Sequence, residues 1–210
     1  MLYNLLYPLH ETYSFLNIFR YITFRTIYAT LMALALSLLI GKRVTDLLAR
    51  YQMGQPVRED GPASHESKAG TPTMGGIIIL GAVLSSTLLW ADLTNHYIWL
   101  VIFVTVAFGA IGFWDDYLKC IRKNSAGLLP RVKFSLQIFA AGITAIGIYL
   151  SDAYASHLSV PFFKNLAPDL GPFYILFAIL VVVGASNAVN LTDGLDGLAI
   201  GPVIVAAVAY

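Results

Sequence analysis

Long apolar stretches separated by short polar segments dominate the chain. Five of them, at 19–40, 74–90, 97–114, 134–150 and 173–189, approach the roughly 20 apolar residues that a helix needs to cross a bilayer. A sixth begins near Leu198 and stops at Tyr210, where a helix of about 13 residues rises only about 20 Å. We therefore predict an all-α integral membrane protein, a polytopic helical bundle with five full spans plus a truncated sixth, and expect the chain to continue beyond this point.

Composition supports this interpretation. Of the 210 residues, 58% are hydrophobic and 12% are charged, whereas a soluble domain carries about 25% charged residues. The single cysteine and four scattered histidines exclude a disulfide framework and disfavour a zinc site. The net charge of +1 gives no reason to expect nucleic acid as a partner. The first residues lack the basic region and cleavage site of a signal peptide, so we expect the N-terminus to be retained.

The distribution of lysine and arginine predicts the orientation. Basic residues concentrate in the connections at about 41–73 and 115–133, whereas the connection between the fourth and fifth spans contains only Lys164. Because short basic connections face the cytoplasm, we place both there and the N-terminus outside. By parity, the connection at 190–197 is cytoplasmic as well. The whole chain, 1–210, is then the N-terminal portion of a single multi-pass membrane domain with three cytoplasmic loops.

The first segment with candidate chemistry is 68–76, directly before the second predicted span. Thr71 or Thr73 can cap the helix, Pro72 suits its first turn, and the glycines allow an anion to approach backbone N–H groups at the positive end of the helix dipole. Lys68 adds a cation nearby. The alternative is a capped helix whose glycines pack closely against a neighbouring helix.

The second segment is the acidic end of the third span, with Asp115, Asp116 and Lys119. Adjacent carboxylates repel each other, and a divalent cation or a basic partner relieves that repulsion. If the helix continues, Asp116 and Lys119 share a face while Asp115 points about 100° away, so the two carboxylates can serve different partners. The alternative is a solvated helix end, although acids there oppose the helix dipole.

The third segment, 187–198, contains Asn187, Asn190, Asp193 and Asp196. Their oxygens are hard ligands of the kind that magnesium prefers. Alternatively, Asp193 or Asp196 merely caps the sixth helix. Four carboxylates on one membrane face, beside lysines and a glycine-rich helix start, are the groups that phosphoryl transfer uses.

At these motifs the chain resembles the phospho-N-acetylmuramoyl-pentapeptide-transferase family (translocase I, MraY) of the polyprenyl-phosphate sugar-1-phosphate transferase superfamily. The resemblance covers 21–25, 60–62, 64–65, 68–76, 112–119, 160–164 and 187–199. It implies a ten-helix, usually homodimeric, magnesium-dependent enzyme of the bacterial cytoplasmic (inner) membrane with its active site on the cytoplasmic face. Such an enzyme transfers phospho-N-acetylmuramoyl-pentapeptide from UDP to undecaprenyl phosphate, which forms lipid I and UMP in peptidoglycan synthesis.

The resemblance also implies roles for individual residues. Asp115 and Asp116 correspond to catalytic positions and, with Asp193, are candidate metal ligands. The substrate-binding candidates are Lys68, Thr73, Lys119, Asn187, Asn190, Asp193, Gly194, Leu195 and Asp196. The chain covers somewhat over half of the family pattern and lacks a later aspartate, the main magnesium ligand, and a histidine-rich motif. By itself it is expected to hold only part of the site.

Three other functions remain open on the sequence. The nearest is a related polyprenyl-phosphate N-acetylhexosamine-1-phosphate transferase. A lipid or solute transporter would place its acids at mid-membrane, whereas here they collect at one face, and the third is a docking subunit for another membrane protein. Within the enzyme hypothesis, a lipid phosphate with a second pKa of about 6 is already largely dianionic at neutral pH, so Asp115 is expected to position groups more than to remove a proton. A covalent aspartyl-phosphate route is also open.

Overall fold

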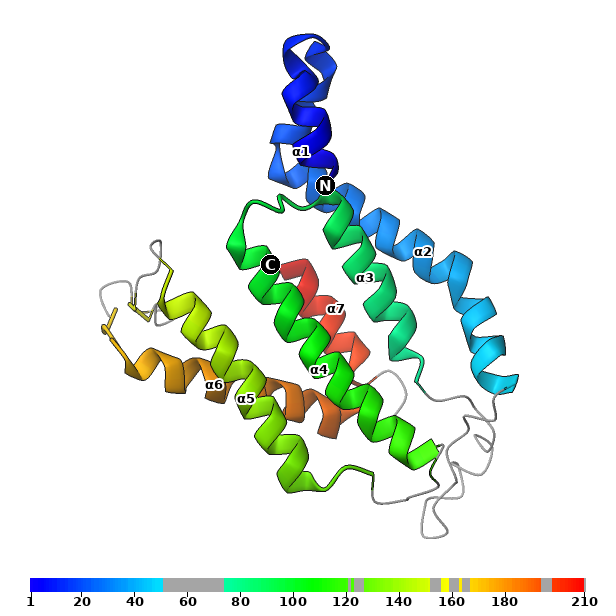
Figure 1. The fold of residues 1–210 in the computed structure, drawn as a ribbon, viewed down its shortest axis with the longest axis vertical. Coiled ribbons are helices and arrows are strands. Elements are labelled where there is room, and N and C mark those ends of the chain that lie inside the picture. Colours follow the sequence, from blue (N-terminus) through cyan, green and yellow to red (C-terminus); the bar gives the residue numbers. More distant parts are fainter. Residues whose placement is uncertain are drawn as a thin grey trace. The chain divides into compact units, whose positions relative to one another are not determined.

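A computed structural model describes residues 1–50, 74–120, 122, 127–151, 156–158, 163, 167–193 and 198–209. Within these residues the ordered structure is helical (Figure 1). The described part contains one isolated antiparallel bridge, between His157 and Asp169, and no named strand. The prediction of an all-α polytopic membrane protein is confirmed.

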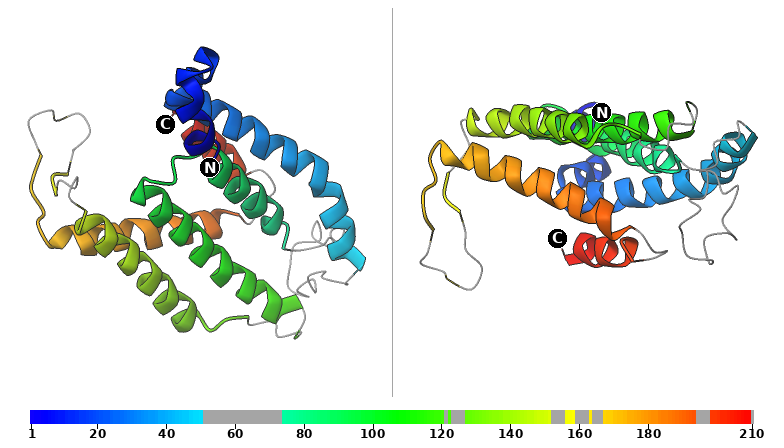
Figure 2. Two further views of the ribbon diagram at one scale, coloured as in Figure 1. Left: turned by 45° about the horizontal axis from the view of Figure 1, so that its top comes forward. Right: turned by 90° about the horizontal axis from the view of Figure 1, so that it is seen from below.

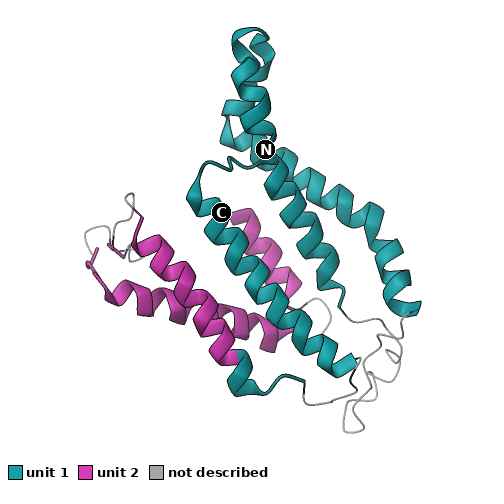
Figure 3. Ribbon diagram, in the orientation of Figure 1, with its two compact units in different colours: residues 1–133 teal, residues 134–210 magenta. Residues whose placement is uncertain are grey.

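The chain divides into two compact units, Met1–Lys133 and Phe134–Tyr210 (Figure 3). The first unit contains α1 (Leu2–Leu6), the 3-10 helices η1 (Tyr7–Glu11) and η2 (Ser14–Arg20), α2 (Ile22–Arg50), α3 (Gly76–Trp90), α4 (His96–Cys120) and the first turn of α5 (Pro130–Tyr149). The second contains the rest of α5, α6 (Phe173–Thr192) and α7 (Ile200–Ala209).

Four of the described helices, α2, α4, α5 and α6, are long and apolar enough to cross a membrane. The predicted span at 74–90 corresponds to α3, which has 15 residues and does not reach that length. The predicted sixth segment corresponds to α7, whose described part has 10 residues. Four of the five predicted full spans therefore qualify by length and composition, and the side of the membrane that each connection faces stays a prediction.

The ends of three helices differ from those of the predicted membrane-spanning segments. Helix α2 begins at Ile22 instead of residue 19, because Tyr21 has an extended backbone (φ −74°, ψ 122°) that separates it from η2. It ends at Arg50, and α4 and α6 end at Cys120 and Thr192. The polar residues near the ends of α4 and α6 consequently lie on helices, which fix the directions in which their side chains leave the backbone.

Packing in the first unit brings the last turns of α3 against α2 (Figures 1 and 2). Trp90 stacks on Tyr28 with ring centroids 5.4 Å apart and donates its indole N–H to the Met32 sulfur at 3.3 Å. Helix α4 approaches α3 closely at Gly109, where a Cβ atom would lie 2.5 Å from a Leu80 methyl carbon. These contacts set the positions of α3 and α4, the two helices on which the first candidate residues lie.

In the second unit, a polar contact joins α5 and α6. The Asn187 side chain donates to Gln137 Oε1 at 2.8 Å, and Gln137 is buried. Many other side chains of this unit, such as Phe173 and Leu180, are apolar and exposed. Such an exposed apolar surface suits contact with lipid or with further membrane helices.

Candidate functional site

A buried carboxylate organises the end of α4. Asp115 is 6% exposed. Its Oδ2 atom accepts hydrogen bonds from Lys119 Nζ at 2.8 Å and Lys133 Nζ at 3.4 Å, and its Oδ1 atom accepts the Leu128 N–H at 2.8 Å. Asp115 thus joins α4 to the connection that follows it and to the first turn of α5.

The local sequence explains this geometry. Because α4 remains helical to Cys120, Lys119 lies one turn after Asp115 and on the same face. Gly127 has a φ of +62°, which favours glycine, and a Cβ atom there would lie 2.4 Å from Asp115 Oδ1. Pro130 suits the first turn of α5, which then presents Lys133 to the same carboxylate.

The charges in this cluster compensate one another. A buried ionised carboxylate without partners is destabilising, and two ammonium groups with a backbone N–H remove that cost for Asp115. The sequence placed Lys119 on the face of Asp116, but the observed ion pair is with Asp115, because a spacing of four residues aligns the side chains better than a spacing of three. The prediction that the two carboxylates diverge agrees with the geometry.

Asp116 lies on another side of α4, where it lines a cavity of about 340 Å³. The start of α3 lines the same cavity through Met74, Gly76 and Ile77. A Cβ atom on Gly75 or Gly76 would have no neighbour within 4 Å among the described residues, so close packing does not explain these glycines. The N-cap of α3 is Gly75, with no side-chain cap hydrogen bond, whereas the sequence offered Thr71 or Thr73, which lie outside the described residues. The cavity joins one predicted carboxylate to the predicted anion-binding helix start.

Three further candidates lie along α6. Asn187 uses its amide group as a donor to Gln137 Oε1 and to the Val183 carbonyl, both at 2.8 Å. Asn190 is exposed and lies about one turn later. Asp193 is exposed at the C-cap, where its backbone N–H donates to the Val189 carbonyl at 3.1 Å.

The other candidates, Lys68, Thr73, Gly194, Leu195 and Asp196, lie outside the described residues. The capping alternative for Asp196 falls outside them too. Asp115 and Asp116 belong to the first unit and Asp193 to the second. That these aspartates converge on one pocket stays a prediction.

Comparison with known proteins identifies the family. The model named "Glycosyl transferase family 4" matches residues 98–210, more than half of the chain, and therefore covers α4 through α7. The chain belongs to glycosyl transferase family 4. A second model, "Phospho-N-acetylmuramoyl-pentapeptide-transferase signature 1", matches residues 68–80, which include the start of α3. The resemblance predicted from the motifs is confirmed.

Curated relatives align over the entire chain. A "Phospho-N-acetylmuramoyl-pentapeptide-transferase" of Desulforapulum autotrophicum is 56% identical over 210 residues, which make up 100% of this chain and 58% of the relative. Proteins of the same name from Desulfatibacillum aliphaticivorans and Syntrophus aciditrophicus are 57% and 52% identical, again over 100% of this chain and 59% and 58% of their own lengths. The chain thus spans less than two thirds of the length of these relatives.

The described carboxylates differ in how well each suits a divalent metal. Among the described residues, no group of three or more His, Cys, Asp or Glu side chains is arranged around a point that could hold a metal. The oxygens of Asp115 already accept hydrogen bonds from two ammonium groups and an N–H, and the ammonium groups would repel a cation. Asp116, on the cavity, and Asp193, at the end of α6, are the described carboxylates that suit a ligand role.

Sequence reasoning missed three residues that lie against candidate residues: Lys133 and Gly127 at Asp115, and Gln137 at Asn187. Lys133 was used only to predict which side of the membrane its connection faces. Nothing in the local pattern links it to Asp115 across the α4–α5 connection. Gly127, followed by a proline at 130, is typical of a turn, but the sequence does not show that this turn lies against the Asp115 carboxylate. Gln137 was overlooked within an apolar stretch, although a polar residue in a membrane-spanning helix is a signal to look for a partner.

Proposed function

We propose that the complete protein transfers phospho-N-acetylmuramoyl-pentapeptide from UDP to undecaprenyl phosphate, forming lipid I and UMP. The support is the alignment of the whole chain, at 50–57% identity, with relatives that carry the name phospho-N-acetylmuramoyl-pentapeptide-transferase. One observation carries the proposal. The segment that the phospho-N-acetylmuramoyl-pentapeptide-transferase signature matches includes Met74, Gly76 and Ile77, and these residues line the same cavity as Asp116.

In this reaction the Asp115 cluster supplies fixed positive charge. Lys119 and Lys133 are 30% and 21% exposed, so their ammonium groups can contact a ligand while Asp115 holds them. An oxygen of the lipid phosphate attacks the sugar-linked phosphorus, the bond from that phosphorus to the bridging oxygen breaks, and UMP leaves. Positive charge near the equatorial and leaving oxygens stabilises the transition state.

Asp115 positions groups in this scheme instead of acting as a base. Its carboxylate already accepts hydrogen bonds from two ammonium groups and the Leu128 N–H. The attacking phosphate has a second pKa of about 6 and needs no deprotonation at neutral pH. A covalent phospho-aspartate would require Asp115 to release these partners, which favours direct transfer between the two substrates.

We propose Mg²⁺ as the metal. Magnesium would neutralise the diphosphate of the nucleotide substrate and polarise the bond to the leaving group. Asp116 and Asp193 are the described carboxylates proposed to contribute ligands. We also propose that the protein works as a homodimer in the bacterial cytoplasmic membrane, with this site on the cytoplasmic face.

Release of UMP by the complete protein tests the proposal. We expect release from UDP-N-acetylmuramoyl-pentapeptide only when both undecaprenyl phosphate and Mg²⁺ are present. Faster release from UDP-N-acetylglucosamine would replace the proposed substrate with an N-acetylhexosamine nucleotide. Movement of substrate across vesicles without UMP formation would favour a transporter. Recovery of a radiolabelled protein after incubation with phosphorus-labelled nucleotide alone would replace direct transfer with the covalent route.

A further inference from the structure

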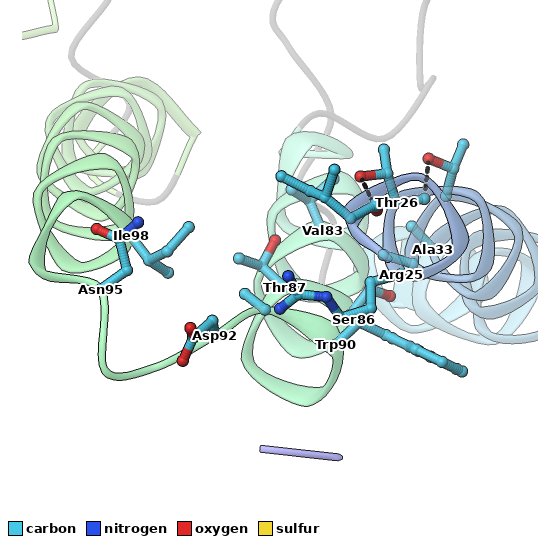
Figure 4. Close-up of a pocket in the computed structure, with 14 residues that line it drawn as sticks. Arg25, Thr26, Ala33, Val83, Ser86, Thr87, Trp90, Asp92, Asn95 and Ile98 are labelled. Atoms are coloured by element: carbon cyan, nitrogen blue, oxygen red, sulfur yellow. Dashed lines mark hydrogen bonds between the residues drawn. The ribbon is translucent and has the colours of Figure 1, made fainter. Parts of the chain in front are cut away.

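A second cavity lies in the first unit, at the other end of α3 and α4 from Asp116. Its volume is about 510 Å³, and Figure 4 shows the residues that line it. The first turns of α2, the last turns of α3 and the connection to α4 line it. Its walls combine apolar groups, such as Ala29, Ala33 and Val83, with the polar side chains of Arg25, Ser86 and others.

Two polar atoms in this cavity are buried without a hydrogen-bond partner among the described residues: Arg25 Nε and Ser86 Oγ. Ser86 is 2% exposed, and Arg25 extends from α2 toward Ser86 and Thr87 on α3 (Figure 4). Buried donors without partners are uncommon and destabilising, so they indicate a missing acceptor.

The surroundings favour an anion as that acceptor. The Arg25 guanidinium carbon lies over the Tyr3 ring, 4.3 Å from its centre, and the guanidinium group brings a positive charge to the cavity. Asp92 also lines the cavity, but its Oδ1 accepts the Thr94 N–H at 3.1 Å and the Thr94 hydroxyl at 2.7 Å. The planar guanidinium group matches the spacing of two phosphate oxygens.

The position of the cavity indicates where that anion comes from. It is lined by Ile98 at the beginning of α4, whereas Asp115 lies near the end of the same helix. With a rise of about 1.5 Å per residue the two levels are roughly 25 Å apart, close to the thickness of a bilayer core. If α4 crosses the bilayer and Asp115 lies near one surface, the cavity lies near the lipid headgroups of the other surface, and Ala33 and Val83 lie one to two turns deeper on their helices.

We propose that this cavity binds an anionic phospholipid, with its phosphodiester on Arg25 and Ser86 and the start of an acyl chain along Ala29, Ala33 and Val83. A small inorganic anion would leave the apolar wall uncovered, and a zwitterionic lipid would bring a further cation next to the guanidinium group. The site is separate from the Asp115 cluster and does not depend on the proposed function.

Native mass spectrometry of the delipidated complete protein tests this site. We expect one phosphatidylglycerol to bind in preference to phosphatidylcholine, and Arg25→Gln to weaken that binding about tenfold. Arg25→Lys keeps the positive charge but loses the planar guanidinium group. Its affinity for phosphatidylglycerol should lie between those of the unsubstituted protein and the Arg25→Gln protein. Arg20→Gln is the matched control, because Arg20 is exposed at the end of η2 and does not line the cavity.

Three outcomes would overturn the proposal. Equal binding of phosphatidylglycerol by the Arg25→Gln and Arg20→Gln proteins would remove Arg25 from the site. Equal binding of the two lipids by the unsubstituted protein would remove the anion from the recognition. Inorganic phosphate is the third case. If it raises the Tm of the unsubstituted protein but not that of the Arg25→Gln protein, and displaces no lipid, the cavity is a small-anion site instead.

Discussion

The ammonium nitrogen of Lys119 lies 2.8 Å from Oδ2 of Asp115, one helical turn earlier on α4. Lys133 reaches the same oxygen from the first turn of α5 at 3.4 Å. A carboxylate near the C-terminal end of a helix opposes the helix dipole when it has no partner. Here the Asp115 carboxylate instead binds two ammonium groups, and this contact holds both of them in place. The stability of this part of the molecule and the positions of the Lys119 and Lys133 ammonium groups both depend on Asp115.

Replacing Lys119 should destabilise the protein more than replacing Lys133. Lys119→Gln removes the shorter contact to a buried carboxylate, and we expect a loss of about 1–3 kcal/mol in the free energy of unfolding. Chemical unfolding of the complete protein in detergent measures it. In a double-mutant cycle with Asp115→Asn, the two losses should be less than additive by about 1 kcal/mol. Additive losses would show that the ion pair contributes nothing.

Gly127 should tolerate alanine poorly. The substitution would force a Cβ atom to within 2.4 Å of Asp115 Oδ1 and 2.5 Å of Lys119 Cε at a φ of +62°. We expect thermal unfolding to show a destabilisation of about 2–4 kcal/mol, from backbone strain and the clash together. Gly171→Ala is the control, because Gly171 has a φ of +47° but open space around a Cβ atom. If Gly127→Ala and Gly171→Ala destabilise the protein equally, the Asp115 carboxylate moves away from the new methyl group at no cost in stability.

The sequence was informative about features that recur along the chain and uninformative about features that depend on a single distant contact. Apolar runs predicted the helices because a span must be apolar along its whole length. Helix ends were misplaced because the apolar pattern and the backbone change at different points. The backbone is extended at Tyr21, inside an apolar stretch, whereas the polar residues after 40 end the apolar stretch while α2 continues to Arg50.

Gln137 should act as a positioning residue for Asn187. Gln137→Ala removes the acceptor that holds the Asn187 amide, so we expect KM for the sugar nucleotide to rise about fivefold or more while kcat changes less. Steady-state kinetics of UMP release measures both constants. Thr144→Ala is the matched control, because Thr144 is buried on the same helix and donates its hydroxyl to the Ala140 carbonyl of that helix. An equal rise in KM for both variants would reduce Gln137 to a packing role.

The connection between α5 and α6 should open at acid pH. Hydrogen bonds from the Ser156 hydroxyl and the Gly171 N–H lower the pKa of Asp169 below its ordinary value. A carboxyl group whose pKa is lower in the folded state stabilises that state above its unfolded pKa, and the stabilisation disappears as the pH falls through the folded value. Hydrogen exchange at the Leu158 and Leu170 amides, which bond across this connection, should therefore accelerate in that acid range. Exchange that follows only the intrinsic pH dependence would contradict this.

For the candidate site, the sequence identified the acids but not their partners. Adjacent carboxylates at 115 and 116 required compensation on electrostatic grounds alone, and their divergence followed from helical geometry. That Asp115 is held by Lys133 could not be read from the sequence, because the turn at Gly127 determines which residue of α5 arrives at the carboxylate. Asp116 faces the cavity at the start of α3 through the packing of Gly109 on Leu80, which no local pattern encodes.

The most direct test is the turnover of the complete protein with Asp115→Asn. Asparagine keeps an oxygen for the Leu128 N–H but loses the charge that holds Lys119 and Lys133. We predict that UMP release falls at least about a hundredfold, while its pH profile still follows the lipid phosphate near about pH 6. Turnover within about twofold of the unsubstituted protein, a change too small for a lost electrostatic contact in a transition state, would contradict the role assigned to Asp115.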